Sequence, residues 1–215
     1  MDMKPVKTIA LLGGTGRTGS LVLQMAFDEG YQLRVLARKT AKVQIKHPNV
    51  IVIEGDATNR SKLEELIDGA DVVISVLGHV KNSSRDFQTQ SMEMVTGIMK
   101  QRKTSRIIVL TGAGVYFPGD KTSMGGQLLT FLIKHLAPAR FNDGVGLSNV
   151  IAKSGLQYTL VRAPLLTNET LKGNYRTGNL PLSFFSRISR ADMAHFIVSQ
   201  IESMRWIQQA PFVCY

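Results

Sequence analysis

Three glycines at a spacing of three residues, Gly13, Gly16 and Gly19, constrain this chain more than any other feature. They follow an apolar run over residues 8–12 and open a segment whose apolar residues recur at helical spacing. A strand, a glycine-rich turn and a helix in this order form the usual site for the pyrophosphate of a dinucleotide. Because the context fits, we favour this interpretation over an ordinary glycine-rich turn. We expect the dinucleotide to contact Gly13, Thr15, Gly16, Arg17, Thr18 and Gly19.

The end of the next expected strand indicates which dinucleotide is bound. Residues 32–38 form an apolar segment that ends in Arg38, followed by Lys39. An NAD site usually has an Asp or Glu at this point, which binds the ribose 2′-hydroxyl, and none is present. An arginine can instead hold a 2′-phosphate with two parallel hydrogen bonds. We therefore predict NADP(H) as the cofactor, the alternative being that Arg38 and Lys39 are only a solvated strand end.

Apolar runs and helical patterns alternate along the chain, which predicts an α/β fold. We expect a Rossmann-type, doubly wound, mostly parallel sheet in a single domain over residues 1–215, with residues 166–188 as substrate-side loops. Strands are expected at 7–12, 32–38, 50–54, 71–77, 106–111, 157–163 and 211–214. Helices are expected at 17–29, 59–69, 86–102, in one or two pieces within 121–154, and at 190–204. Capping signals are expected at Ser61 and Ser189.

Ligands of such sheets bind beyond the carboxyl ends of the strands, which selects further site residues. Asp56, with Ala57, is expected near adenine, although an aspartate there can also cap a turn. Leu77, Gly78 and His79 are expected beside the nicotinamide-side ribose, His79 being either a ligand-binding or a plain surface histidine. Thr111 is the candidate for a hydrogen bond to substrate, the alternative being a bond to its own backbone. The turn with Arg162 and Pro164 completes this predicted site.

Composition limits the classes of partner. The net charge of +10 is shared evenly by the two halves of the chain, and the basic clusters are not interleaved with aromatic residues, which argues against nucleic acid. No apolar run reaches the roughly eighteen residues of a membrane span. The single cysteine, Cys214, and the lack of room for a signal peptide lead us to expect a cytoplasmic protein. We expect its partner to be a small-molecule substrate, and the protein to be a monomer or weak dimer. The histidines show no metal-ligand spacing, so no metal is expected, and Phe131 and Leu136 are expected in a helical core rather than on a partner surface.

Several motifs together resemble the atypical short-chain dehydrogenases/reductases of the NAD(P)-binding, NmrA-like group, and by layout the biliverdin-IXβ reductase/flavin reductases. The motifs are Gly-Gly-Thr-Gly-Arg-Thr-Gly at 13–19, Val-Leu-Ala-Arg at 35–38, Gly-Asp at 55–56, Asp-Val-Val-Ile at 71–74, Ser-Gly-Leu-Gln-Tyr-Thr at 154–159, Val-Arg-Ala-Pro at 161–164 and Ile-Ser-Arg-Ala-Asp-Met-Ala at 188–194. The resemblance implies pyrophosphate on the 13–19 loop, the 2′-phosphate on Arg38, and backbone of the 77–79 and 162–165 turns beside the nicotinamide.

Two departures from that pattern bear on the substrate. The family's Thr-Ser pair after the fifth strand reads Thr111-Gly112 here, and Leu165 and Leu166 stand where the family has a histidine soon after the proline turn. Both departures argue against tetrapyrrole reduction and leave cofactor binding intact.

The catalytic pattern of many short-chain reductases, Tyr-x-x-x-Lys, is absent from the sequence. The pattern places the lysine four positions after the tyrosine, but Lys121 comes five positions after Tyr116. Arg162 comes four positions after Tyr158, but both lie on an expected strand. We therefore expect hydride transfer from NADPH to a small conjugated acceptor, a flavin or quinone, which needs no strong acid. Two alternatives stay open: a non-enzymatic NADP(H)-binding redox sensor that binds a protein partner and, third, a sugar-nucleotide epimerase-like enzyme.

Overall fold

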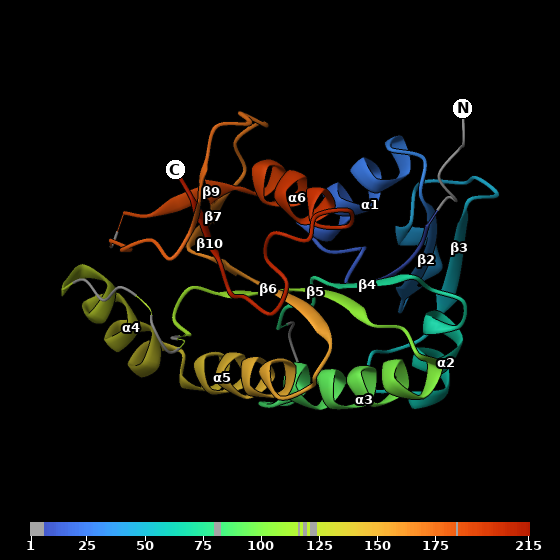
Figure 1. Cartoon of the computed structure of the whole chain (residues 1–215), viewed down its shortest axis with the longest axis horizontal. Helices are drawn as coiled ribbons and strands as arrows, with labels where there is room; N and C mark the ends of the chain where they lie inside the picture. Colours follow the sequence, from blue (N-terminus) through green and yellow to red (C-terminus); the bar gives the residue numbers. More distant parts are fainter. Residues whose placement is uncertain (1–6, 80–82, 116, 118–119, 121–123, 184) are drawn as a thin grey trace.

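A computed structural model describes residues 7–79, 83–115, 117, 120, 124–183 and 185–215. Its centre is an eight-stranded sheet in the order β3-β2-β1-β4-β5-β6-β10-β8 (Figure 1). All neighbouring strands are parallel except β10 and β8, which are antiparallel. The strands are β1 (Thr8–Leu12), β2 (Gln32–Ala37), β3 (Val50–Glu54), β4 (Val72–Ser75), β5 (Arg106–Gly112), β6 (Gln157–Ala163), β8 (Arg176–Gly178) and β10 (Phe212–Cys214).

Helices cover both faces of this sheet, which makes the fold a Rossmann-type α/β domain (Figure 1). Helices α1 (Gly19–Asp28) and α6 (Arg190–Ser199) pack on one face, and α2 (Arg60–Ile67), α3 (Phe87–Arg102) and α5 (Pro138–Ala152) on the other. The central strands are largely apolar because both of their faces are buried: in β1, Ile9 and Leu11 lie in one core, and Ala10 and Leu12 lie in the opposite one. A short 3-10 helix, η1 (Thr40–Lys42), follows β2.

The strand order reverses between β2 and β4, which both pair with β1. Leu12, at the end of β1, is in register with Leu36 on one side and Ser75 on the other. In an open parallel sheet this reversal leaves a crevice beyond the carboxyl ends of the strands, where ligands bind. The fold therefore places the glycine turn that follows β1 at that crevice.

The predicted elements and the structure agree closely, with a few corrections. Each of the seven expected strands is present, and the 121–154 segment contains two helices, α4 (Met124–Leu136) and α5. The expected helix at 190–204 ends at Ser199. Ser189 caps α6 as predicted, its hydroxyl accepting from the Asp192 backbone N–H at 2.9 Å. The cap predicted at Ser61 is wrong, because the side chain of Asn59 caps α2 instead.

Residues 166–188, predicted to be loops, contain regular structure. Strand β8 pairs with β10 and extends the main sheet, whereas β7 (Leu165–Thr167) and β9 (Arg187–Ser189) form a separate two-stranded parallel sheet. Each of these strands has three residues, too few to produce a recognisable alternation in the sequence.

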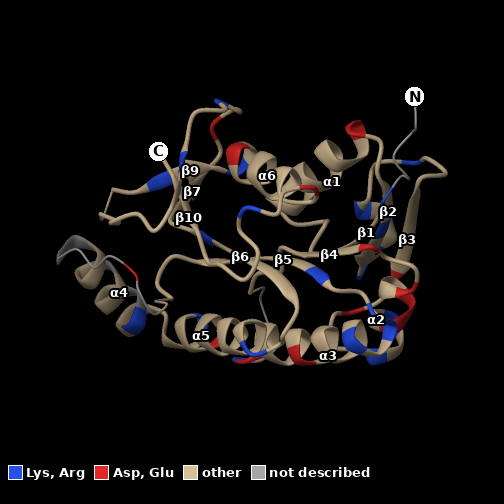
Figure 2. Cartoon of the chain, in the orientation of Figure 1, with Lys and Arg blue, Asp and Glu red and all other residues tan. Residues whose placement is uncertain are grey.

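Helix α4 lies beyond the end of the sheet (Figure 1). The expectation that Phe131 and Leu136 belong to a helical core is wrong, since they are 56% and 81% exposed. Figure 2 shows Lys and Arg spread over several helices and loops and intermingled with Asp and Glu. Within the described parts of the chain, none of the helices has the length and apolar character that crossing a membrane requires.

Candidate functional site

The turn after β1 is built around close backbone contacts that only glycine permits. Gly13 has a φ of +81°, and a Cβ added there would lie 2.7 Å from the carbonyl oxygen of Val76. The Gly13 carbonyl accepts from the Gly16 N–H at 2.9 Å and also faces Gly19, where an added Cβ would lie only 2.0 Å away. At Gly16 the added Cβ would be 3.2 Å from the same oxygen, which is tight but much less severe. Gly13 and Gly19 are thus required by the fold, and Gly16 far less.

Helix α1 begins at this turn with its positive end uncompensated. Its first flanking residue, Thr18, makes no side-chain capping bond, and the first turn carries no acidic residue. Helix N-termini of this kind bind phosphate groups through backbone N–H groups and the helix dipole. The geometry therefore suits a pyrophosphate, as the sequence motif predicts.

A first cavity, of about 200 Å³, lies next to the glycine turn. Arg38 lines it, is exposed, and makes no hydrogen bond within the described parts of the chain. Lys42 also lines it, and the sequence analysis did not identify this residue. Asp56 is another lining residue, but its Oδ1 accepts from the backbone N–H of Thr58 at 3.0 Å and from its hydroxyl at 2.8 Å. Asp56 thus caps a turn and faces the cavity at once.

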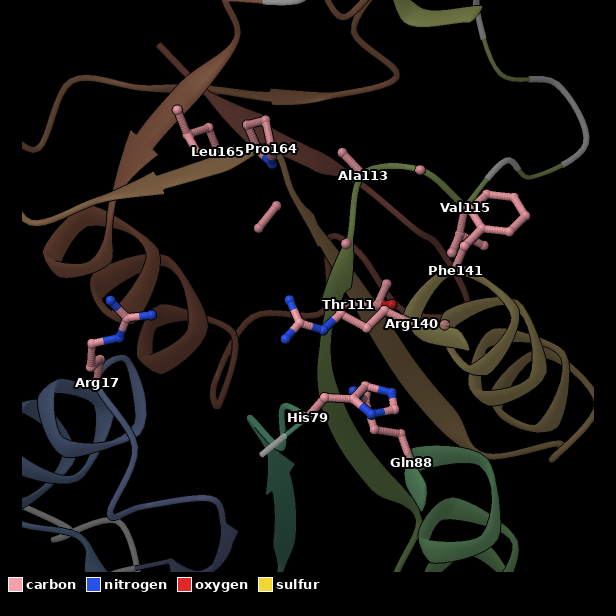
Figure 3. A pocket seen from close by; sticks show the side chains of 14 residues that line it. Arg17, His79, Gln88, Thr111, Ala113, Val115, Arg140, Phe141, Pro164 and Leu165 are labelled. Atoms are coloured by element: carbon pink, nitrogen blue, oxygen red, sulfur yellow. The ribbon is translucent and has the colours of Figure 1, made fainter. Parts of the chain in front are cut away.

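A second cavity, of about 580 Å³, lies beyond the ends of β5 and β6 (Figure 3). Its lining includes residues 112–114 together with Thr111, Phe141 and Pro164. Thr111 is almost buried, and its hydroxyl makes no hydrogen bond in the part of the chain that the structure describes. The alternative of a backbone-bonded threonine is therefore not observed, and this hydroxyl is available to a ligand.

The structure brings most of the predicted site residues together at the sheet edge. The first cavity is lined by Gly13, Thr15, Gly16, Arg38, Asp56, Ala57, Leu77 and Gly78. The second is lined by Arg17, His79, Thr111 and Pro164. Four predicted residues line neither cavity: Thr18, Gly19, Lys39 and Arg162.

His79 is held in the wall of the second cavity by an acid that the sequence did not reveal. Its Nε2 lies 2.8 Å from Oδ2 of Asp143, a fully buried carboxylate on α5, and its Nδ1 lies 3.2 Å from the Ser83 hydroxyl. Asp143 also accepts from the backbone N–H groups of Gln88 and Thr89, at 2.9 and 2.8 Å, and so caps α3 from another helix. The Nδ1 nitrogen thus contacts a hydroxyl, and Nε2 lies beside the Asp143 carboxylate without a hydrogen bond in the described structure, so the ring is positioned in the cavity wall.

Arg162 has a structural role that its position in the sequence did not indicate. Its guanidinium is buried and pairs with Asp120, Nη2 donating to Oδ1 at 2.7 Å, and it also donates to the carbonyls of Ala210 and Val115. The ring centre of Phe212 lies 3.7 Å from its Cζ. The side chain therefore ties the end of β6 to its neighbours and is not available to a ligand.

The structure describes one of the two tyrosines that the sequence analysis considered as acids. Tyr158 lies at the start of β6, the end opposite to the ligand edge, and burial raises the pKa of its phenol. Tyr116 and Lys121 lie outside the described residues. No tyrosine or lysine is found among the described residues that line the second cavity. Within the described ranges, no group of three or more His, Cys, Asp or Glu is arranged to hold a metal ion.

Fold and site together define a dinucleotide-binding Rossmann domain. The family model described as NAD(P)H-binding matches residues 13–204, and the chain belongs to this family. Among curated proteins it is similar to the uncharacterized protein YwnB of Bacillus subtilis, with 22% identity over 200 residues, covering 90% of this chain and 92% of that protein.

Two solved structures illustrate the likeness in fold. A short-chain dehydrogenase/reductase from Veillonella parvula, in complex with NADP, has a TM-score of 0.77 at 21% identity, covering 96% of this chain and 94% of that one. ChuY, an anaerobillin reductase from Escherichia coli O157:H7, has a TM-score of 0.79 at 19% identity, covering 96% of each chain. At these identities the likeness establishes the fold. The family match adds NAD(P)H binding.

Proposed function

We propose that this protein is an NADPH-dependent reductase that transfers a hydride to a small conjugated acceptor of the flavin or quinone type. The observation that carries the proposal is the pair of cavities at one sheet edge. Within the described residues, the first cavity contains an Arg38 without a hydrogen-bond partner beside the glycine turn, and the second contains a Thr111 hydroxyl without one. The resemblance to atypical, NmrA-like short-chain reductases and the reductase among the structural neighbours support the same activity.

The residues of the first cavity fit NADPH. Arg38 and Lys42 present two cations where a 2′-phosphate would bind, and the uncapped start of α1 faces the expected pyrophosphate. No Asp or Glu follows β2 to favour a free 2′-hydroxyl. When bound, NADPH supplies the hydride, and the chain contributes binding and orientation.

The second cavity then positions the acceptor. The Thr111 hydroxyl can donate a hydrogen bond to an acceptor oxygen or nitrogen, and the apolar walls formed by Phe141, Val115 and Pro164 suit a flat ring system. The described lining offers no tyrosine–lysine pair that would protonate an alkoxide. Acceptors that spread the incoming charge over a conjugated system and take a proton from water match this arrangement. Simple ketones do not.

The test is NADPH oxidation, followed by absorbance, with FMN, riboflavin, a naphthoquinone, simple ketones and, in reverse, secondary alcohols. The proposal predicts turnover with flavins or quinones and little or none with the unactivated ketones and alcohols. Robust turnover of a simple secondary alcohol, abolished by Tyr116→Phe or Tyr158→Phe, would show that a tyrosine acid operates and would refute the proposed mechanism.

A second candidate function is an NADP(H)-binding redox sensor that docks on a protein partner. The observation that favours it is the exposure of three large apolar side chains on α4, namely Leu128, Phe131 and Leu136. Stoichiometric NADPH binding without oxidation by any flavin, quinone or tetrapyrrole would favour this sensor over the reductase.

A further inference from the structure

The ionisable side chains described in the lining of the second cavity are all basic. They are Arg17, His79 and Arg140, and none of the described residues that line this cavity is Asp or Glu. The Asp143 carboxylate, which lies 2.8 Å from His79 Nε2, is fully buried and already accepts hydrogen bonds from the backbone N–H groups of Gln88 and Thr89. The cavity therefore carries positive charge that its own walls do not neutralise.

Arg140 is the cation best placed to act on a substrate. It lies in the first turn of α5, and its guanidinium points from that helix toward the middle of the cavity, near Thr111 (Figure 3). It is exposed and makes no hydrogen bond or ion pair within the described parts of the chain. Arg162, by contrast, has its guanidinium buried against Asp120. A planar guanidinium with unused donors is suited to bind a carboxylate or phosphate through two parallel hydrogen bonds.

The other cations of the cavity have different roles. Arg17 belongs to the glycine turn and lies on the far side of the cavity from Arg140, where the cofactor phosphates are expected (Figure 3). His79 is held between Asp143 and Ser83. Arg140 also borders a neighbouring cavity lined by Asp86 and Asp143, but the Asp86 carboxylate accepts from the side-chain amide of Gln90 at 2.7 Å and makes no ion pair with Arg140.

We propose that the acceptor is an anion, and that Arg140 binds its carboxylate or phosphate group while the conjugated body lies against the apolar wall near Thr111. This inference rests on the proposed reductase function and adds the charge of the substrate to it. Arg140 is thereby a specificity-determining residue. It holds one end of the acceptor and takes no part in moving the hydride or a proton.

Pairs of acceptors with the same ring system but different charge test this inference. FMN and riboflavin share one ring system, and so do a sulfonated naphthoquinone and its neutral parent. The wild-type protein should have a KM about tenfold or more lower for the anionic member of each pair, as expected for a charge-assisted bidentate contact. Raising the ionic strength should increase the KM of the anions and leave that of the neutral acceptors unchanged.

Variants at Arg140 assign the effect to this side chain. Arg140→Gln should raise the KM for FMN to that for riboflavin with kcat nearly unchanged, and Arg140→Lys should restore part of the difference. Lys153→Gln, which removes an exposed cation next to the other end of α5, is the matched control and should behave like wild type. Both glutamine variants should unfold at the wild-type temperature, because neither side chain has a partner in the described structure.

Equilibrium binding separates failure of this inference from failure of the proposed function. FMN and riboflavin are titrated by flavin fluorescence into the protein saturated with NADP⁺. If neither flavin is reduced but FMN still binds more tightly in an Arg140-dependent manner, the reductase assignment fails and the anion site stands. If FMN and riboflavin bind equally, or if Arg140→Gln leaves the FMN affinity unchanged, the inference is overturned.

Discussion

The glycine turn allows a sharp prediction, because its glycines differ in what surrounds them. An alanine at position 19 would place its Cβ 2.0 Å from the carbonyl oxygen of Gly13 and 2.7 Å from the carbonyl carbon of the same residue. Both clashing atoms belong to the backbone, so no change of side-chain rotamer can relieve the contact. The turn or the start of α1 must move by about an ångström, a shift of the kind that costs about 1–3 kcal/mol in overpacked sites.

The magnitude follows from the size of the domain. For a chain of this length, each kcal/mol lowers the midpoint of thermal unfolding by roughly 2–4 °C. We therefore expect Gly19→Ala to unfold about 2–12 °C below wild type. NADPH binding should also be weakened severely, because the Gly13–Gly16 hydrogen bond that shapes the turn is displaced.

Two other glycines provide controls for this experiment. Gly16→Ala meets only a 3.2 Å contact, so it should unfold near the wild-type temperature yet bind NADPH poorly, since its Cβ enters the space expected for the pyrophosphate. At Gly97, inside α3, an added Cβ meets nothing within 4 Å, so Gly97→Ala should stabilise by about 0.5–1 kcal/mol. Differential scanning fluorimetry, with and without NADPH, measures both effects. A Gly19→Ala protein as stable as Gly16→Ala would refute the reasoning.

Two further predictions concern pH dependence and catalysis. Burial alone would raise the pKa of Asp192, but hydrogen bonds from the Tyr215 and Ser189 hydroxyls and from the backbone N–H groups of Gly173 and Lys172 outweigh it and lower the pKa below the ordinary value of 3.8. Asp192→Asn should therefore cost about 2–3 kcal/mol of unfolding free energy at neutral pH. Because the folded pKa is the lower one, the ionised Asp192 contributes its full stabilisation above about pH 5, and this contribution decreases below pH 3.8 and is lost as the pH falls through the lower folded pKa. Chemical denaturation at several pH values measures the difference between the two proteins, and a difference independent of pH would contradict the prediction. Thr111→Val should lower the turnover rate by about tenfold to a hundredfold, because it removes one hydrogen bond to the acceptor and no proton-transfer step. Steady-state kinetics that show either a complete loss of activity or an unchanged turnover rate would contradict this role.

The features that the sequence predicted well are those with local signals. The glycine spacing at 13–19 and the apolar strands each depend on residues adjacent in the chain, and the sheet-edge rule then brings residues as distant as Arg38 and Thr111 to one side of the molecule. Strands of three residues, such as β8, carry too little pattern to be recognised.

The missed residues depend on contacts between distant segments. Asp143 meets His79 across 64 positions of the chain, and Asp120 meets Arg162 across 42. No spacing rule links such partners before the packing of the helices is known. The sheet-edge rule placed Arg162 at the correct end of its strand, but it could not show that the side chain turns into a buried ion pair. Arg140 was missed for the same reason, since only the position of α5 brings it to the cavity.

The predicted preference for NADPH over NADH depends on Arg38, so a substitution at this residue tests the proposed cofactor site most directly. Dissociation constants for NADPH and NADH, measured by titration of the wild-type protein and of Arg38→Asp, are the decisive data. Lys39→Gln is the control, because Lys39 is the neighbouring cation but does not line the first cavity. The wild-type protein should bind NADPH more tightly than NADH by about 1.5–3 kcal/mol, roughly tenfold to a hundredfold, and Arg38→Asp should narrow or invert that preference. Equal dissociation constants for the two cofactors in the wild-type protein would contradict the account.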